Sequence, residues 1–265
     1  MLTCLLEGSR SREMFLSVST HLPISSSEKP PIIFVHGAGT TSAVWVYWQR
    51  RLTAEGWPTY NMDLRGHGYS EAIDLTHTGM WDYVEDVNAV ARQLSVKPIL
   101  IGWSMGGHVA ILAASLGGYS ACVTLDPDPP VSHSDDSIEL VPGEYMPEEI
   151  GYDVVGNPDA LPGMPDLTTE ERSLAQQSLT KESRLVGQER RRGILVKAVP
   201  CPVLEIVGGY NDYYPTETSY YSTGIADRQI YVQEASHWGL MLNKRIVPWL
   251  LNEVVGWLDT KGCGA

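Results

Sequence analysis

The stretch that decides the fold of this chain is Pro98-Ile99-Leu100-Ile101-Gly102-Trp103-Ser104-Met105-Gly106-Gly107. Its first half is a continuous apolar run, which is typical of a parallel strand buried on both faces. Small and apolar residues follow over 108–114 and favour a helix. The segment therefore predicts a buried strand that passes through a tight turn into a helix, with Ser104 at the apex of the turn.

The two glycines around Ser104 fit the pattern Gly-x-Ser-x-Gly of a turn that presents a serine nucleophile. Gly102 and Gly106 would let the strand and the helix approach each other without a clash between Cβ atoms. The free N–H groups and the positive dipole end of the helix would then point at the serine. Because so short a motif also occurs by chance, the rest of the chain has to support it.

Apolar strands and amphipathic helices alternate along most of the chain. Strands are predicted at 31–35, 57–62, 98–103, 121–125, 201–207 and 228–233, helices at 44–55, 80–94 and 247–258, and an opening hairpin between 2–6 and 14–18. This alternation predicts an α/β fold, with a mainly parallel sheet and helices on both of its faces.

The alternation stops at Asp126-Pro127-Asp128-Pro129-Pro130. From there to about Gly193 no buried strand is predicted, and only 168–186 favours a helix. Since a structureless loop of this length is uncommon inside a compact domain, we predict an inserted cap, or lid, over the site. The predicted core domain comprises 1–130 and 194–265, and the predicted cap comprises 131–193.

The charge of the chain is negative and unevenly distributed. The 265 residues carry a formal net charge of −13, which argues against nucleic acid and anionic membrane surfaces as partners. Residues 98–171 contain no Lys or Arg but 13 acidic side chains. This stretch is interpreted either as a solvated acidic face or as a lid that disfavours anionic substrates.

Cysteine usage and apolar patterning bear on the cellular location. The four cysteines, Cys4, Cys122, Cys201 and Cys263, are far apart and form neither a disulfide framework nor a zinc pattern. The first residues lack the features of a signal peptide, and no run is long enough to span a membrane. We therefore expect a cytoplasmic protein with a small-molecule substrate, either a monomer or a homodimer.

A serine hydroxyl becomes a nucleophile when an imidazole accepts its proton and a carboxylate orients that imidazole. Ser104, Asp212 and His237 offer these groups, each after a predicted strand, and parallel strands end at one crevice. Asp212 is the preferred acid. Its rivals are Asp126 and Asp128, whose alternative role is that of turn and cap residues in a proline-rich segment.

Other polar residues near strand ends are interpreted as structural. Asp63 also follows a predicted strand, but its neighbour Arg65 suggests an ion pair. His36 and His67 lie in glycine-rich loops, where hydrogen bonds to the backbone are the expected role.

Acyl transfer also needs N–H donors for the oxyanion that forms in the transition state. The N–H of Met105, directly after the serine, is one expected donor. The loop His36-Gly37-Ala38-Gly39 should supply the second, from Ala38 or, as the alternative, from Gly39. One such donor typically lowers the barrier by about 3–4 kcal/mol.

Five stretches, taken together and in order, resemble the α/β-hydrolase superfamily, in its branch of small serine esterases. They are His36-Gly37-Ala38-Gly39, Asp63-Leu64-Arg65-Gly66-His67-Gly68-Tyr69-Ser70, Gly102-Trp103-Ser104-Met105-Gly106-Gly107, Gly209-Tyr210-Asn211-Asp212 and Ser236-His237-Trp238. The resemblance implies the α/β-hydrolase fold and acyl transfer through Ser104, without a metal or a cofactor.

The same resemblance leaves the substrate open. A carboxylic ester or a lactone is the first expectation, and a thioester, a carbon–carbon bond or a slow, receptor-like triad are the alternatives. The branches with an aspartate nucleophile, the dehalogenases and epoxide hydrolases, are excluded because Ser104 holds that position.

Several residues next to the motifs are candidates for a substrate pocket. They are Gly39, Trp45, Trp103, Asp128, Tyr213 and Trp238. The aromatic members predict a pocket for a neutral or hydrophobic acyl group, with ordinary core packing as the alternative.

Overall fold

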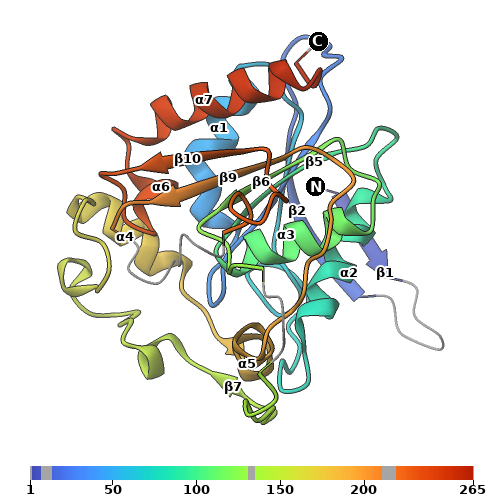
Figure 1. The fold of residues 1–265 in the computed structure, drawn as a ribbon. Helices are drawn as coiled ribbons and strands as arrows, with labels where there is room; N and C mark the ends of the chain where they lie inside the picture. The colour runs from blue at the N-terminus through green and yellow to red at the C-terminus, as the bar shows by residue number, and fades with distance from the viewer. Residues whose placement is uncertain (1, 7–13, 131–134, 211–218, 265) are drawn as a thin grey trace.

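An eight-stranded sheet in the order β1-β2-β4-β3-β5-β6-β9-β10 forms the centre of the molecule (Figure 1). The computed structural model describes residues 2–6, 14–130, 135–210 and 219–264. The strands are β1 (Leu2–Leu6), β2 (Met14–His21), β3 (Ile32–Val35), β4 (Thr59–Met62), β5 (Ile99–Trp103), β6 (Ala121–Leu125), β9 (Val203–Gly208) and β10 (Arg228–Val232). Strand β2 pairs antiparallel with β1 and β4, and the remaining pairs are parallel, which confirms the predicted mainly parallel sheet.

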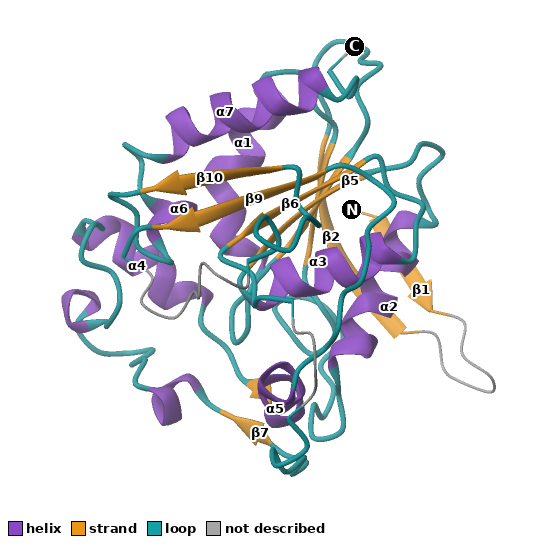
Figure 2. Ribbon diagram, in the orientation of Figure 1, coloured by secondary structure: helices purple, strands orange, loops and turns teal. Residues whose placement is uncertain are grey.

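Helices cover both faces of this sheet (Figure 2). The helices of the sheet domain are η1 (Ser42–Trp45), α1 (Val46–Ala54), α2 (Met80–Ala91), α3 (Met105–Ser115), α6 (Gly239–Leu242) and α7 (Val247–Thr260). Within β3, Ile32 and Phe34 join the cluster that contains α1 and α7, whereas Ile33 and Val35 join the cluster that contains α2 and α3. This is the period of two expected of a strand with both faces buried.

The segment between β6 and β9 lies beyond the carboxyl ends of the parallel strands (Figure 1). We call residues 135–193 the cap segment. Its elements are β7 (Glu144–Tyr145), η2 (Pro147–Ile150), η3 (Pro158–Ala160), α4 (Thr169–Ser178), β8 (Glu182–Ser183) and α5 (Arg184–Arg192). Leu161 and Met164 belong to the same hydrophobic cluster as Trp238 of the sheet domain, so the cap segment packs onto that domain's core. Its status as a separate domain stays a prediction.

The helix predicted over 168–186 is divided in two by an extended stretch. Helix α4 ends at Ser178, and α5 begins only at Arg184. Between them, the N–H of Thr180 donates to the carbonyl oxygen of Gly39 at 2.8 Å, and β8 pairs with β7. Contacts to other parts of the chain therefore override the local helical pattern here.

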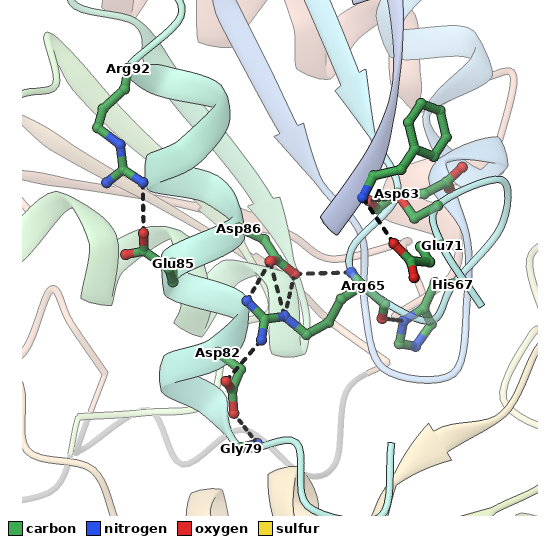
Figure 3. Close-up of polar contacts among 11 residues, drawn as sticks. Asp63, Arg65, His67, Glu71, Gly79, Asp82, Glu85, Asp86 and Arg92 are labelled. Carbon is green, nitrogen blue, oxygen red and sulfur yellow. Dashed lines mark hydrogen bonds and ion pairs between the residues drawn. The ribbon is translucent and has the colours of Figure 1, made fainter. Parts of the chain in front are cut away.

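The loop after β4 is held to α2 by Arg65 (Figure 3). The Arg65 guanidinium contacts the buried carboxylate of Asp86 at 2.7 Å. The expected ion pair between Asp63 and Arg65 is wrong, because Asp63 instead accepts hydrogen bonds from the N–H groups of Ser42 and Tyr69, at 2.8 and 3.0 Å. Within the described ranges, every helix is too short or too polar to span a bilayer.

Candidate active site

Ser104 lies in the turn between β5 and α3, with φ 56° and ψ −128°. This conformation is strained for a residue with a side chain. A Cβ atom on Gly106 would lie 2.2 Å from the carbonyl oxygen of His36, and one on Gly102 would lie 2.2 Å from the carbonyl oxygen of Gly106. Both glycines are therefore required for the helix to start this close to the sheet.

His237 meets a buried carboxylate at the end of β6. Its Nδ1 lies 3.0 Å from Oδ2 of Asp126, whose Oδ1 accepts a hydrogen bond of 2.8 Å from the N–H of Gly208. The Asp126 side chain is fully buried, whereas that of His237 is 32% exposed. Asp126 has a φ of 41°, and in the described part of the chain it shares a positive φ with Ser104 alone among non-glycine residues. Strain of this kind tends to occur at functional sites.

The sequence favoured Asp212 as the carboxylate that orients His237. Asp212 lies outside the described residues. Of its two rivals, Asp126 contacts His237, whereas Asp128 pairs with Arg190 of the cap segment at 2.8 Å. Strands β6 and β9 are parallel neighbours in the sheet, so the loops after both strands open at the same crevice. Because both strands end at the same edge, the sequence pattern alone did not decide between an aspartate after β6 and one after β9.

Ser104, Asp126 and His237 line one cavity of about 450 Å³. Apart from Asp128, its other walls are mostly apolar or aromatic and include Pro127, Pro129, Ile150, Tyr152, Pro162 and Trp238. A smaller cavity of about 70 Å³ lies on the side of Ala38 and Gly39 and shares His237 with the larger one. The cap segment contributes Ile150 and Tyr152 to both cavities, and no motif in the sequence marked either residue.

The residues predicted to form the pocket are distributed between these cavities. Trp238 lines both, Asp128 lines the larger one, and Gly39 and Trp103 line the smaller one. Tyr213 lies outside the described residues.

Trp45 is in a different position from that predicted. It is fully buried and packs against Phe34 and Trp48, with ring centroids 4.9 and 5.7 Å apart. It belongs to the core beneath α1, because η1 turns its side chain toward β3, so ordinary core packing accounts for it.

Two contacts hold the loop that carries His237. The indole N–H of Trp103 donates to the carbonyl oxygen of His237 at 3.0 Å, and the two rings pack with centroids 4.9 Å apart. From the cap segment, Asp166 accepts a hydrogen bond from the N–H of Ser236 at 3.2 Å. The imidazole is thus placed by residues from the sheet and from the cap segment together.

The loop 36–39 lies directly beside Ser104. A Cβ atom on Gly37 would lie 3.2 Å from the Cβ of Ser104. The N–H of Gly39 donates to Oε2 of Glu182 at 3.1 Å and is therefore already engaged. Of the two alternatives for the second oxyanion donor, this leaves Ala38 as the better one. The other expected donor, Met105, is the first residue of α3.

His36 is a neutral imidazole. Its Nδ1 lies 2.9 Å from the carbonyl oxygen of Gly37, to which it donates, and its Nε2 accepts from the N–H of Leu64 at 3.1 Å. Burial lowers the pKa of His36 to about 4, which agrees with this neutral form.

His67, 5.1 Å from His36 between ring centroids, faces acceptors on both of its nitrogens. Its Nδ1 donates to the carbonyl oxygen of Arg65 at 2.8 Å, and its Nε2 lies 3.3 Å from Oε2 of Glu182. Burial opposes its charge, but the Glu182 carboxylate outweighs burial and raises the pKa of His67. The contact with Glu182 favours the protonated form of His67, and both histidines have the backbone hydrogen bonds that the sequence predicted.

No group of three or more His, Cys, Asp or Glu side chains is arranged to hold a metal ion in the part of the chain that the structure describes.

Comparison with known proteins places this geometry in a family. A family model described as "Alpha/beta hydrolase family" matches residues 32–247. The pimeloyl-[acyl-carrier protein] methyl ester esterase of Aliivibrio salmonicida is 32% identical over 90 residues, which cover 34% of this chain and 32% of that protein. The AB hydrolase superfamily protein YisY of Bacillus subtilis is 39% identical over 85 residues, 31% of this chain and 30% of that protein. The chain thus spans about a third of the length of these curated relatives.

A solved structure resembles this one over nearly its whole length. A thermophilic esterase from Thermogutta terrifontis superposes with a TM-score of 0.70 at 18% identity, covering 98% of both chains. At this identity the likeness concerns the fold.

Proposed function

The chain belongs to the α/β hydrolase family, and we propose that it is a serine hydrolase that cleaves a carboxylic ester through an acyl-enzyme intermediate. The observation that carries the proposal is the 3.0 Å contact between His237 Nδ1 and Asp126 Oδ2, in a cavity that also contains Ser104. A carboxylate at this nitrogen keeps the proton on Nδ1 and leaves Nε2 free to accept one from a serine.

In the proposed mechanism, His237 accepts the proton of the Ser104 hydroxyl as its oxygen attacks the ester carbonyl carbon. The N–H groups of Ala38 and Met105 stabilise the negative oxygen of the tetrahedral intermediate. His237 then protonates the departing alcohol, and the acyl group stays on Ser104. A water molecule, deprotonated by His237, releases the acid and restores the enzyme.

The substrate we propose is small and neutral or hydrophobic, an ester of a short or medium acyl chain or a lactone. The cavity of about 450 Å³ has proline, isoleucine and aromatic walls, which suit an apolar acyl group. The charged groups in its lining, Asp126 and Asp128, are acidic and would repel an anionic substrate. The Aliivibrio relative is a methyl ester esterase, which supports ester cleavage. The cytoplasmic location stays a prediction.

Hydrolysis of p-nitrophenyl esters of increasing acyl length, together with a panel of lactones and thioesters, tests this proposal. We expect the wild type to turn over short and medium esters and to be labelled at Ser104 by a fluorophosphonate, and Ser104→Ala to lose both properties. Full activity in Ser104→Ala would refute the assignment of the nucleophile. An inactive wild type that binds a small molecule tightly would favour the receptor alternative.

A further inference from the structure

We propose that Glu182, in the cap segment, is a positioning residue of the oxyanion hole. It would hold the main chain of Gly39 so that the adjacent N–H of Ala38 faces the reacting carbonyl. The inference rests on the proposed function, because an oxyanion hole has a role only if Ser104 forms a tetrahedral intermediate.

The Glu182 carboxylate is fully buried, and both of its oxygens accept hydrogen bonds. Oε2 accepts from the N–H of Gly39 at 3.1 Å and lies 3.3 Å from Nε2 of His67. Oε1 accepts from the hydroxyl of Tyr83 at 2.5 Å and from its neighbour's N–H, that of Ser183, at 2.7 Å. Burial alone would raise the pKa of Glu182, but the charge of His67 and these hydrogen bonds lower it to about 2.

The cap segment holds Gly39 at both of its polar main-chain atoms. Its N–H donates to Glu182, and its carbonyl oxygen accepts from the N–H of Thr180 at 2.8 Å. Gly39 has a φ of 62°, so the chain turns sharply immediately after Ala38. With both atoms of Gly39 fixed, the Ala38–Gly39 peptide has little freedom to rotate. This limits the backbone torsions of Ala38 and thereby the direction of its own N–H, which belongs to the Gly37–Ala38 peptide. A donor placed before the reaction adds no reorganisation cost when charge develops on the substrate oxygen.

The buried charges make this support stiff. The side chains of Glu182 and His67 are both fully buried, and Nε2 of His67 lies 3.3 Å from Oε2 of Glu182. Removal of either partner would leave an uncompensated charge, so the pair resists separation. His67 also donates to the carbonyl oxygen of Arg65, so Glu182 and His67 connect the loop 36–39, which we call the oxyanion loop, to the loop after β4.

The test compares kcat, KM and transition-state-analogue inhibition in Glu182→Ala and in the conservative variant Glu182→Gln. We expect kcat of Glu182→Ala to fall between about tenfold and a hundredfold, with KM changed less than threefold, because a displaced donor weakens the transition state more than the bound ester. The inhibition constant of a trifluoromethyl ketone, which forms an oxyanion on Ser104, should rise in parallel with the fall in kcat/KM. Glu182→Gln keeps an acceptor oxygen for the N–H of Gly39 but loses the charge that faces His67, so its kcat should lie between that of Glu182→Ala and that of the wild type.

Glu189→Ala is the matched control. Glu189 is also a cap carboxylate that accepts a main-chain N–H, from Met80 at 2.7 Å, but at the start of α2 rather than in the oxyanion loop. Its kcat should stay within twofold of the wild type. Equal losses in the two alanine variants, or a loss confined to KM in Glu182→Ala, would overturn the inference.

A milder variant covers the case in which Glu182→Ala does not fold. Tyr83→Phe removes one hydrogen bond to Glu182 and keeps the buried ion pair, so we expect a threefold to tenfold lower kcat and a matching rise in the ketone inhibition constant. An unchanged kcat in a folded Tyr83→Phe would overturn the inference. If the wild type itself neither cleaves esters nor reacts with a fluorophosphonate, the proposed function fails instead.

Discussion

Replacement of Asp126 by asparagine tests the proposed triad most directly. Gly208 N–H donates to Oδ1 of Asp126 at 2.8 Å, so the carbonyl oxygen of the new amide would keep that position. Its NH2 group would then face Nδ1 of His237. That arrangement favours the tautomer with the proton on Nε2, which is unable to accept the serine proton. Because asparagine tolerates a φ of 41° as well as aspartate does, the fold should be retained.

The structure allows an estimate of the loss. At a separation of 3.0 Å and an effective dielectric constant of about 20, the carboxylate stabilises an imidazolium by ~5.5 kcal/mol. Since each 1.36 kcal/mol corresponds to about a factor of ten in rate, kcat should fall by about three to four orders of magnitude. The same substitution in serine proteases costs about 10⁴ in kcat.

Steady-state hydrolysis of a p-nitrophenyl ester measures this loss, and circular dichroism and thermal unfolding verify the fold. Asp128→Asn is the matched control, because Asp128 lies two residues away but pairs with Arg190, and its kcat should change less than tenfold. If Asp126→Asn keeps more than a tenth of the wild-type kcat while Asp212→Asn loses a thousandfold, the acid is Asp212 and the assignment of Asp126 is refuted.

Three further predictions follow from the packing around the site. Gly106→Ala places a Cβ about 2.2 Å from the His36 carbonyl oxygen. This clash should lower Tm by about 6–12 °C, which calorimetry measures, and it should abolish the hydrolysis of p-nitrophenyl esters. Trp103→Phe removes the 3.0 Å hydrogen bond to the His237 carbonyl, worth about 1 kcal/mol, and should lower kcat by roughly five- to tenfold with little change in Tm; an unchanged kcat would show that the indole does not position the loop. Burial lowers the pKa of His108 from 6.5 to about 4, so the unfolded chain binds a proton before the folded one does, and stability on the order of 3 kcal/mol is lost as the pH falls from 6.5 to 4. His108→Leu should flatten that part of the curve of unfolding free energy against pH, and a curve identical to that of the wild type would contradict this assignment.

Sequence patterns were sufficient to predict the sheet and the tight turn at Ser104. The run 121–125 is predicted as a strand, and β6 has the same limits. The strained turn at Ser104 also follows from local sequence, because Gly102 and Gly106 are the residues that its geometry requires. The contact that requires glycine at 102 is local, with Gly106, whereas the contact that requires glycine at 106 comes from the carbonyl oxygen of His36 in the neighbouring strand loop.

The choice of the acid depends on contacts between distant residues. Asp126 and His237 are 111 positions apart, and Asp126 reaches the histidine through a backbone conformation that is unusual outside glycine. The proline-rich segment that follows the strand did not indicate that Asp126 would adopt this conformation. For the same reason, no local pattern indicated that Glu182 would lie outside a helix and contact the buried side chain of His67.

The acidic character of the insertion also has a structural explanation that neither interpretation of the sequence anticipated. Several of its carboxylates accept main-chain N–H groups of the sheet domain. Glu144 binds Leu75 at 2.6 Å and Glu171 binds Lys244 at 2.7 Å, while Asp166 binds Ser236 beside His237. These side chains join the cap segment to the sheet domain.

The extended stretch at 179–183 has a consequence for protein engineering. Exchange of caps between related hydrolases is a natural way to alter substrate range. In this protein, the position of the graft boundary relative to Glu182 would determine whether the recipient keeps the buried carboxylate that binds the N–H of Gly39. A functional chimera should therefore retain residues 179–183 from the parent that supplies the loop 36–39, and the boundary for recombination lies inside the insertion rather than at its ends.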